Sequence, residues 1–257
     1  MISGVLLDLA GVIYDGEEVI PGATDAVARL REAGLLIRFV SNTTRSNKQA
    51  LLQRLAGLGL YATSDELFTP AQAAREWLDK HDRSPYLLVH PDLALDFHDL
   101  AGGPQKALVV GDAGEAFDYQ TLNAAFRELV TGAEFLGLAP NRTFQDVDGK
   151  LSLDAGAFIA ALEFASQRRA TILGKPSPEF FLSALASMNC PKAKAVMVGD
   201  DAETDVAGAL QAGLSKAVLV RTGKYRRGDD TRFPPSPTVT VDDISAAADW
   251  ILAARNI

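Results

Sequence analysis

Polar side chains that are suited to binding a metal ion and a phosphate follow four apolar stretches of this sequence. Two or three carboxylates together form a site for Mg²⁺, because this ion prefers hard oxygen ligands and keeps several of its waters. A lysine combined with hydroxyl and amide groups matches the oxygens of a phosphoryl group. The candidate residues are Asp8, then Ser41, Asn42 and Thr43, then Lys175, and finally Asp200, Asp201 and Asp205.

Asp8 is the first carboxylate of this set. It directly follows the apolar run 5–7, and a bare carboxylate in such a place is costly unless a cation or several donors meet it. A metal ion would cancel the repulsion that stops an aspartate from attacking a phosphate anion, and such an attack gives an aspartyl-phosphate. Such a transfer depends mainly on alignment and charge neutralisation.

The candidate residues follow predicted strands whose carboxyl ends meet at one edge of a parallel sheet. Short apolar runs bounded by turns are typical of strands that are buried on both faces. Helical patterns separate these runs, which predicts right-handed strand–helix–strand units with a ligand crevice outside the carboxyl ends. The expected strands are 5–8, 35–40, 195–198 and 217–220, and the expected helices are 24–33, 48–58, 71–78, 178–188, 205–212 and 244–253.

A second α/β pattern interrupts the first between residues 77 and 171. It comprises predicted strands at 86–89, 106–110 and 134–138, predicted helices at 119–129 and 158–165, and a polar turn at 146–150. We therefore expect an α/β protein with a parallel-sheet core made of residues 1–76 and 172–257 and an inserted α/β domain at 77–171.

The composition argues against several classes of protein. With 25 Lys and Arg against 33 Asp and Glu the formal net charge is -8, which disfavours non-specific binding to nucleic acid. No stretch approaches the ~20 apolar residues that span a bilayer, and Asp8 interrupts the N-terminal apolar run too early for a signal peptide. The single cysteine, Cys190, permits no internal disulfide and indicates a reducing compartment, which we take to be the cytoplasm.

Four motifs, in order, resemble those of the haloacid dehalogenase superfamily. Each is weakly specific alone, but four in order around one insertion are strongly specific, and the resemblance covers nearly the whole chain. The insertion between the second and third motifs is similar to that of the subclass with an α/β cap, class IIA. The motifs are Asp8-Leu9-Ala10-Gly11-Val12, Val40-Ser41-Asn42-Thr43, Gly174-Lys175-Pro176 and Gly199-Asp200-Asp201 with Asp205. One member of the subclass is most similar in the segments 21–23, 39–44, 118–119 and 222–226, and a relative of that member is the next most similar.

The resemblance implies a Mg²⁺-dependent phosphatase with a Rossmann-like core, whose cap closes over the site and selects the leaving group of a small phosphorylated substrate. Asp8 would be the nucleophile and a metal ligand. Ala10 would bind the metal through its backbone carbonyl, and Asp200 would be a further ligand. Lys175 would neutralise both Asp8 and the transferring group.

The remaining motif residues also receive roles from the resemblance. Ser41, Asn42 and Thr43 would bind the phosphoryl group. Asp201 or Asp205 would hold metal-bound waters or Lys175. Caps of this subclass often mediate dimers, so the resemblance adds a homodimer as an expected assembly, with no nucleic-acid or membrane partner.

Ala10 departs from the family pattern. Most phosphatases of the superfamily carry at this position a second aspartate, which protonates the leaving oxygen and then activates water. Alanine does neither, and general acid–base catalysis typically contributes ~10²–10⁴-fold. We therefore expect a slow phosphatase, or one restricted to acyl, aryl, N-linked or pyrophosphate substrates, which need little protonation.

Three alternatives remain at this point. Phosphonatases of the superfamily also carry alanine there, but their Schiff-base lysine comes from a helical cap inserted earlier, which this sequence lacks. A phospho-ligand-binding or regulatory protein would keep the pocket without turnover; Ala10 favours that reading, whereas Asp8 favours an enzyme. A signalling receiver domain combines similar residues, but the length and the insertion oppose it.

Other polar residues have simpler interpretations. The pair Gly111-Asp112 imitates the last motif but lies in the insertion, which favours a turn. The segment 224–227 favours a solvated loop, with a place bordering the site as the alternative. Three histidines without ligand spacing are expected at the surface: His81, His90 and His98.

Overall fold

The computed structural model describes residues 1–146 and 149–255, and the chain divides into two compact units. The first unit, here called the core, comprises residues 1–41, 52–68 and 175–257. The second unit, called the cap, comprises residues 42–51 and 69–174. The polar turn expected at 146–150 includes residues 147 and 148, which lie outside the described residues.

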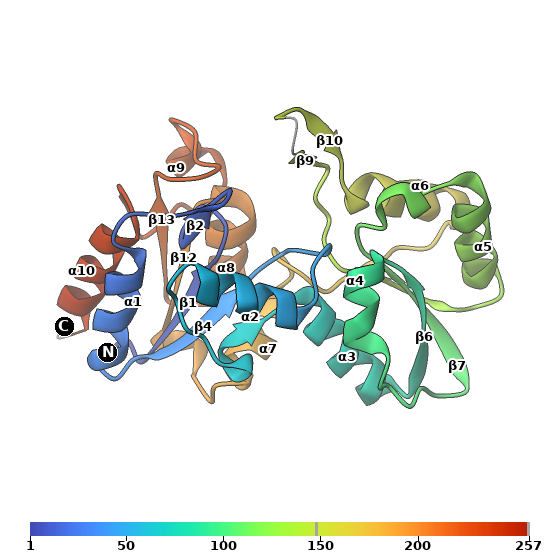
Figure 1. Cartoon of the computed structure of the whole chain (residues 1–257), viewed down its shortest axis with the longest axis horizontal. Coiled ribbons are helices and arrows are strands. Elements are labelled where there is room, and N and C mark those ends of the chain that lie inside the picture. The colour runs from blue at the N-terminus through green and yellow to red at the C-terminus, as the bar shows by residue number, and fades with distance from the viewer. Residues whose placement is uncertain (147–148, 256–257) are drawn as a thin grey trace. The chain divides into compact units, whose positions relative to one another are not determined.

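A six-stranded parallel sheet in the order β14-β13-β12-β1-β4-β5 forms the centre of the core (Figure 1). All five residues of β1 are buried, as expected for a strand with helices on both faces. The register pairs Asp8 with Val40 and Leu7 with Val198, so the residues that follow β4 and β12 emerge beside Asp8. The strands are β1 (Gly4–Asp8), β4 (Leu36–Val40), β5 (Leu67–Phe68), β12 (Ala195–Gly199), β13 (Lys216–Val220) and β14 (Val239–Val241).

Helices cover both faces of the core sheet (Figure 1). On one face α1 (Ala23–Glu32) packs against α10 (Ile244–Ala254). On the other, α7 (Pro178–Ala186) packs against α8 (Gly208–Gln211), which directly continues a π-helix, η5 (Ala202–Ala207). The aromatic ring of Phe180 on α7 meets that of Phe68 edge-on, with 5.2 Å between the ring centroids.

Short elements complete the core. An antiparallel hairpin of β2 (Tyr14–Asp15) and β3 (Glu18–Val19) follows β1. The segment before β5 forms a 3₁₀ turn, η1 (Ser64–Glu66), and the one before β12 forms another, η4 (Lys192–Lys194). The last short helix is α9 (Asp229–Arg232).

The cap has its own parallel sheet, with four strands in the order β11-β8-β7-β6. Its apolar interior includes Leu108 and Val110 of the sheet, Leu129 of α5 and Ile159 of α6. The strands are β6 (Arg83–Leu88), β7 (Gln105–Val110), β8 (Glu134–Gly137) and β11 (Thr171–Ile172), with a separate antiparallel pair, β9 (Thr143–Gln145) and β10 (Leu151–Leu153). The helices are α3 (Pro70–His81), α4 (Pro91–Ala94), η2 (Leu95–Phe97), η3 (Gly114–Ala116), α5 (Tyr119–Val130) and α6 (Ala155–Ser166).

The α/β architecture and the parallel core sheet agree with the sequence prediction. Two short strands, β5 and β14, were not anticipated, because runs of two and three residues show no period. The helix expected from Asp205 begins earlier, at Ala202, and its first part is a π-helix. One helix, α2 (Lys48–Gly57), begins among residues of the cap and ends among residues of the core. Within the described residues, no helix has the length and apolar character that crossing a membrane requires.

Candidate active site

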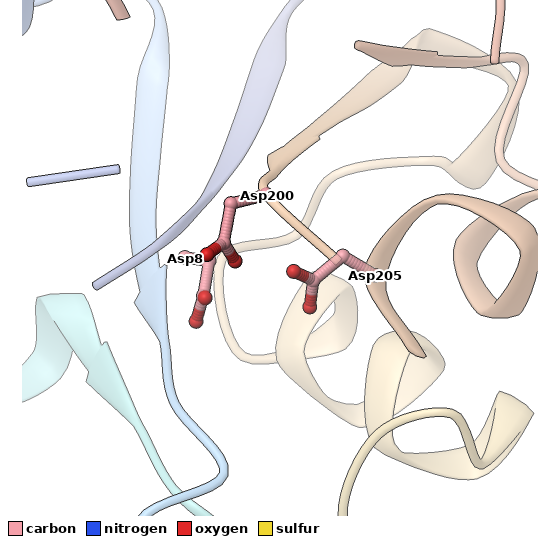
Figure 2. A group of neighbouring side chains, drawn as sticks. All are labelled: Asp8, Asp200 and Asp205. Carbon is pink, nitrogen blue, oxygen red and sulfur yellow. The ribbon is translucent and has the colours of Figure 1, made fainter. Parts of the chain in front are cut away.

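The carboxylate of Asp8 lies at the end of β1 beside two other buried carboxylates. One oxygen from each of Asp8, Asp200 and Asp205 lies within 4.8 Å of the others. Figure 2 shows the three side chains pointing toward one another, from the end of β1, from the residue after β12 and from the π-helix. They are 7%, 2% and 1% exposed, respectively. Three carboxylates this close and this buried require cationic partners.

Lys175 supplies one of these cations. Its Nζ lies 2.6 Å from Oδ1 of Asp8 and 2.6 Å from Oδ1 of Asp205. Burial by itself would lower the pKa of Lys175, but the charges of Asp205 and Asp8 and their hydrogen bonds outweigh burial and raise it above the ordinary lysine value. The ammonium therefore stays charged between the two carboxylates, and Asp205 holds Lys175 directly.

One oxygen of Asp200 has a hydrogen-bond donor, and the other has none among the described residues. Its Oδ2 accepts a hydrogen bond from the backbone N–H of Lys224 at 2.7 Å. Its Oδ1 is buried and has no hydrogen-bond partner within the described residues. Burial, followed by the charge of Asp8, raises the pKa of Asp200 to about 7. The oxygen without a donor and the all-carboxylate set fit a hard cation such as Mg²⁺.

Two glycines make room for the carboxylate of Asp200. A Cβ on Gly11 would lie 1.9 Å from its Oδ2, and a Cβ on Gly223 would lie 2.0 Å from the same atom. Both glycines have a positive φ, 79° and 58°, which other residues rarely adopt. The hydroxyl of Thr222 donates to the backbone carbonyl of Gly11 and joins the two segments.

Asp201 caps the π-helix. Its Oδ1 accepts from the backbone N–H groups of Glu203 at 3.1 Å and Thr204 at 3.0 Å. Its Oδ2 lies 3.6 Å from Nζ of Lys224. Burial opposes ionisation, but the bond from Thr204 and the charge of Lys224 outweigh it and lower the pKa of Asp201. The segment that starts at Lys224 therefore borders the site, which was the alternative to a solvated loop.

Ala10 lies exposed in the turn that follows Asp8. The N–H of Ile13 donates to the carbonyl of Leu9 at 2.8 Å, and the N–H of Gly11 donates to the carbonyl of Tyr14 at 2.7 Å, so the β2–β3 hairpin starts beside the nucleophile. Tyr14, at the start of this hairpin, was not singled out from the sequence, where its only signal was its position in the turn after Asp8. Burial raises the pKa of this tyrosine, so its hydroxyl stays protonated.

The polar residues after β4 fall on both sides of the division between the units. Ser41 belongs to the core, is buried, and donates its N–H to the carbonyl of Phe68 at 3.3 Å. Asn42 and Thr43 belong to the cap. The structure thus brings Asp8, Lys175, Asp200 and Asp205 together, whereas the joining of Asn42 and Thr43 to them remains a prediction.

Family models and curated relatives point to the same protein family. A family model described as haloacid dehalogenase-like hydrolase matches residues 5–117, and a related HAD-hydrolase-like model matches residues 172–247. Haloacid dehalogenase-like hydrolase domain-containing protein 2 from Homo sapiens is 42% identical over 251 residues, which cover 98% of this chain and 96% of the relative. Phospholysine phosphohistidine inorganic pyrophosphate phosphatase from Danio rerio is 41% identical, over 99% of this chain and 96% of the relative. These are the two members that the motifs predicted.

A solved structure shares the fold. The glycerol phosphate phosphatase from Mycobacterium tuberculosis, crystallised in complex with magnesium, superposes with a TM-score of 0.84 at 25% identity. The match covers 95% of this chain and 75% of that one.

Proposed function

This chain belongs to the haloacid dehalogenase-like hydrolases, and from that premise we propose that it is a Mg²⁺-dependent phosphatase that forms an aspartyl-phosphate on Asp8. The proposal extends to a small phosphorylated substrate. It is supported by the names of relatives that are phosphatases and by the magnesium complex of a structural neighbour.

The strongest support for the proposal is a buried carboxylate oxygen of Asp200. The buried oxygen Oδ1 of Asp200, which lacks a hydrogen-bond partner within the described residues, lies in a group of three carboxylates that includes the expected nucleophile. A surface or structural aspartate would have its oxygens in water or paired with donors. A buried carboxylate oxygen left over beside Asp8 supports a cation site next to the reacting group.

Different residues of the chain would carry out different parts of phosphoryl transfer. An oxygen of Asp8 attacks phosphorus while the bond from phosphorus to the leaving oxygen breaks, and the product is an acyl phosphate. Lys175, held between Asp8 and Asp205, balances negative charge beside the attacked group. Ser41, Asn42 and Thr43 are assigned by their motif to the phosphoryl oxygens. Water then attacks the acyl phosphate, which releases inorganic phosphate and restores Asp8.

Asp8 and Asp200, with the backbone carbonyl of Ala10, would hold the Mg²⁺. When bound, the ion supplies positive charge that lowers the repulsion between the nucleophile and the phosphate. The proton for the leaving oxygen comes from solvent, because Ala10 has no acid to give. We therefore expect faster hydrolysis of esters whose leaving groups are weakly basic, such as aryl phosphates.

Hydrolysis of p-nitrophenyl phosphate tests the proposal. We expect turnover with Mg²⁺, none after chelation, and loss of at least ~100-fold in Asp8→Asn. The matched control is Asp15→Asn, which removes an exposed carboxylate of the neighbouring hairpin and should leave turnover intact. Turnover that is independent of Mg²⁺ or of Asp8 contradicts the mechanism. A beryllium fluoride adduct without hydrolysis of any phosphate in a broad panel indicates a binding protein instead.

The missing acid is tested by restoring it. Ala10→Asp should raise kcat for an alkyl ester such as glycerol phosphate by ~10–100-fold, and should raise it much less for p-nitrophenyl phosphate, whose leaving group needs little protonation. Equal effects on both esters, or no gain on either, would show that the acid does not limit the rate.

A further inference from the structure

Tyr14 is a buried tyrosine at the start of the β2–β3 hairpin, just after the turn that follows Asp8. Its backbone N–H donates to the carbonyl of Leu9 at 3.2 Å, and its carbonyl accepts from the N–H of Gly11 at 2.7 Å. It also forms an isolated β-bridge with Ala10. The backbone of this tyrosine is therefore fixed to the turn beside the proposed nucleophile.

The ring of Tyr14 is held by Arg54, which lies in the part of α2 that belongs to the core. The guanidinium carbon of this arginine lies 4.3 Å from the ring centroid. Its Nη2 donates to the carbonyl of Gly16 and lies 3.3 Å from Oε1 of Glu17, both in the hairpin. The tyrosine, the arginine and the hairpin all belong to the core, as does the group of three carboxylates. The stacking therefore limits the orientations of the ring within the unit that carries the nucleophile.

The hydroxyl of Tyr14 has no hydrogen-bond partner within the described residues, although the residue is only 6% exposed. A tyrosine this buried usually pairs its hydroxyl with a protein group. The hydroxyl is not among the fully enclosed side-chain atoms that lack a partner, so it reaches the accessible surface. The one polar atom of this side chain is therefore open to a ligand.

The hydroxyl lies within electrostatic reach of the reacting carboxylate. Burial is the main cause of the raised pKa of Tyr14, and the charge of Arg54 opposes it. The charge of Asp8 raises this pKa further, and the charge of Lys175 lowers it, so both groups act on the same phenol. Even an ordinary tyrosine is protonated at neutral pH, and this hydroxyl is therefore a hydrogen-bond donor.

The leaving oxygen of the substrate lacks a donor in the proposed mechanism. Lys175 and the motif after β4 are assigned to the transferring group, and Ala10 offers no donor. In an in-line displacement the leaving oxygen lies on the side of phosphorus away from the attacking oxygen of Asp8. Negative charge develops on the leaving oxygen in the transition state, and a fixed donor at that point lowers the barrier.

We infer that the hydroxyl of Tyr14 donates a hydrogen bond to the leaving oxygen while the phosphoryl group is transferred. The inference rests on the proposed function and adds to it a residue that contacts the substrate. The bond from Asp8 to phosphorus forms, the bond from phosphorus to the leaving oxygen breaks, and its electron pair stays on the leaving oxygen. Tyr14 keeps its proton, and solvent supplies the proton that the leaving oxygen takes.

Three esters with leaving groups of increasing basicity test the inference: p-nitrophenyl, phenyl and glycerol phosphate. Tyr14→Phe keeps the ring and its stacking but removes the donor. With Mg²⁺ it should lower kcat/KM ~10-fold for glycerol phosphate and less than ~3-fold for p-nitrophenyl phosphate, because the hydrogen bond strengthens as the charge on the leaving oxygen grows.

Tyr61→Phe is the matched control. It removes the hydroxyl of a tyrosine of the core that is 76% exposed, and it should leave kcat/KM for all three esters unchanged. Equal losses on the three esters in Tyr14→Phe, or no loss on any, overturn the inference, because a hydroxyl on another oxygen or in a structural role would not distinguish leaving groups.

Two phosphate analogues test the position of the hydroxyl without turnover. Vanadate bound to Asp8 is surrounded by five oxygens, one of which takes the place of the leaving oxygen. Beryllium fluoride resembles the acyl phosphate and has no atom at that place. With Mg²⁺, Tyr14→Phe should weaken the binding of vanadate ~10-fold and that of beryllium fluoride less than ~2-fold. Calorimetric titration of the intact protein and of both tyrosine variants makes the comparison.

The two measurements separate this inference from the proposed function. If no ester is hydrolysed but Tyr14→Phe weakens vanadate alone, the proposed function fails and the position of the hydroxyl stands. If esters are hydrolysed and Tyr14→Phe weakens both analogues equally, or neither, the inference about Tyr14 fails alone. If the intact protein neither hydrolyses an ester nor binds vanadate, both fail.

Discussion

The same three residues, Val-Gly-Asp, occur where β7 of the cap and β12 of the core end, yet the two aspartates have different surroundings. In the cap, both oxygens of Asp112 accept hydrogen bonds, from Arg45 and from Gly114. In the core, Asp200 has one oxygen bound to the backbone of Lys224 and one oxygen with no partner within the described residues. One aspartate is a completed structural anchor, and the other has capacity left for a ligand.

The difference comes from distant segments and not from the three shared residues. The carboxylate of Asp112 is paired with Arg45, which lies 67 positions earlier in the chain, so it needs no further cation. Asp200 instead faces a second carboxylate, Asp8, which adds to the effect of burial on its pKa. A strand–glycine–aspartate ending therefore marks a functional site only when its neighbours leave the carboxylate unsatisfied.

The largest expected effect is on catalysis. Asp200→Asn should reduce kcat/KM for p-nitrophenyl phosphate with Mg²⁺ by at least ~100-fold, because it removes a carboxylate that would hold the metal ion next to the nucleophile. Asp112→Asn should reduce it less than ~5-fold, because its partners are structural. Steady-state kinetics at saturating Mg²⁺ makes the measurement. Similar losses in both variants would mean that the two aspartates do not differ in role.

Replacing the glycine that precedes each aspartate should destabilise the protein to different extents. A Cβ on Gly199 would lie 2.3 Å from Cβ of Asp205, whereas the nearest atoms to one on Gly111 belong to the side chains of Leu138, Thr44 and Val89 at 3.0–3.4 Å. Gly199→Ala should therefore lower the free energy of unfolding by ~3 kcal/mol or more, and Gly111→Ala by ~1 kcal/mol. Urea unfolding at equilibrium measures both, and a larger loss in Gly111→Ala would contradict the geometry.

Mg²⁺ in the absence of substrate should stabilise the folded protein, and this stabilisation should depend on Asp200 and not on Asp112. At an ion concentration 100-fold above Kd, binding adds ~2.7 kcal/mol, which corresponds to a rise in Tm of ~5–10 °C. This rise should vanish in Asp200→Asn and persist in Asp112→Asn. Without the ion, Asp200→Asn should melt no earlier than the parent, because burial disfavours the charge it removes. Thermal melts with and without Mg²⁺, in the absence of substrate, decide the matter.

The smallest expected effect is on Mg²⁺ affinity, when Thr222 in the segment beside Asp200 is replaced. Thr222→Val removes the hydrogen bond to the carbonyl of Gly11 and should weaken Mg²⁺ binding ~3–10-fold, the value of one hydrogen bond. Thr238→Val is the matched control, because its hydroxyl accepts from Ala217 at 3.0 Å on the neighbouring pair of strands. Calorimetric titration with Mg²⁺ compares them. An equal effect of both variants would show that Thr222 does not position the site.

The parts of the site that the sequence predicted are those that follow long apolar strands. Asp8 and Asp200 end runs buried on both faces, so their meeting at one edge follows from parallel pairing. The position of Lys175 depended on motif order, because it lies in a loop without a periodic pattern. The contact between the residues that follow β13 and the turn after β1 was beyond sequence reasoning, since it joins positions 222 and 11 through one side chain and one carbonyl.

The same limit applies to the cap. Its turn after β7 was predicted, and the N–H of Gly114 bonded to Asp112 agrees with a turn. The burial of Asp112 and its arginine partner were not predicted, because nothing in the local sequence identifies a partner so far away along the chain.

The π-helix at Ala202–Ala207 has a consequence for how the chain tolerates changes in length. A π-turn amounts to one residue more than an ordinary helical turn accommodates. Deleting one residue there would restore α-helical bonding and leave the helix that follows in its register, but it would move the residues within the π-turn relative to β12. If the deletion falls before Asp205, its carboxylate swings away from the ammonium of Lys175. The register of this short helix, more than its composition, is therefore what a shortened homologue or an engineered deletion would have to preserve.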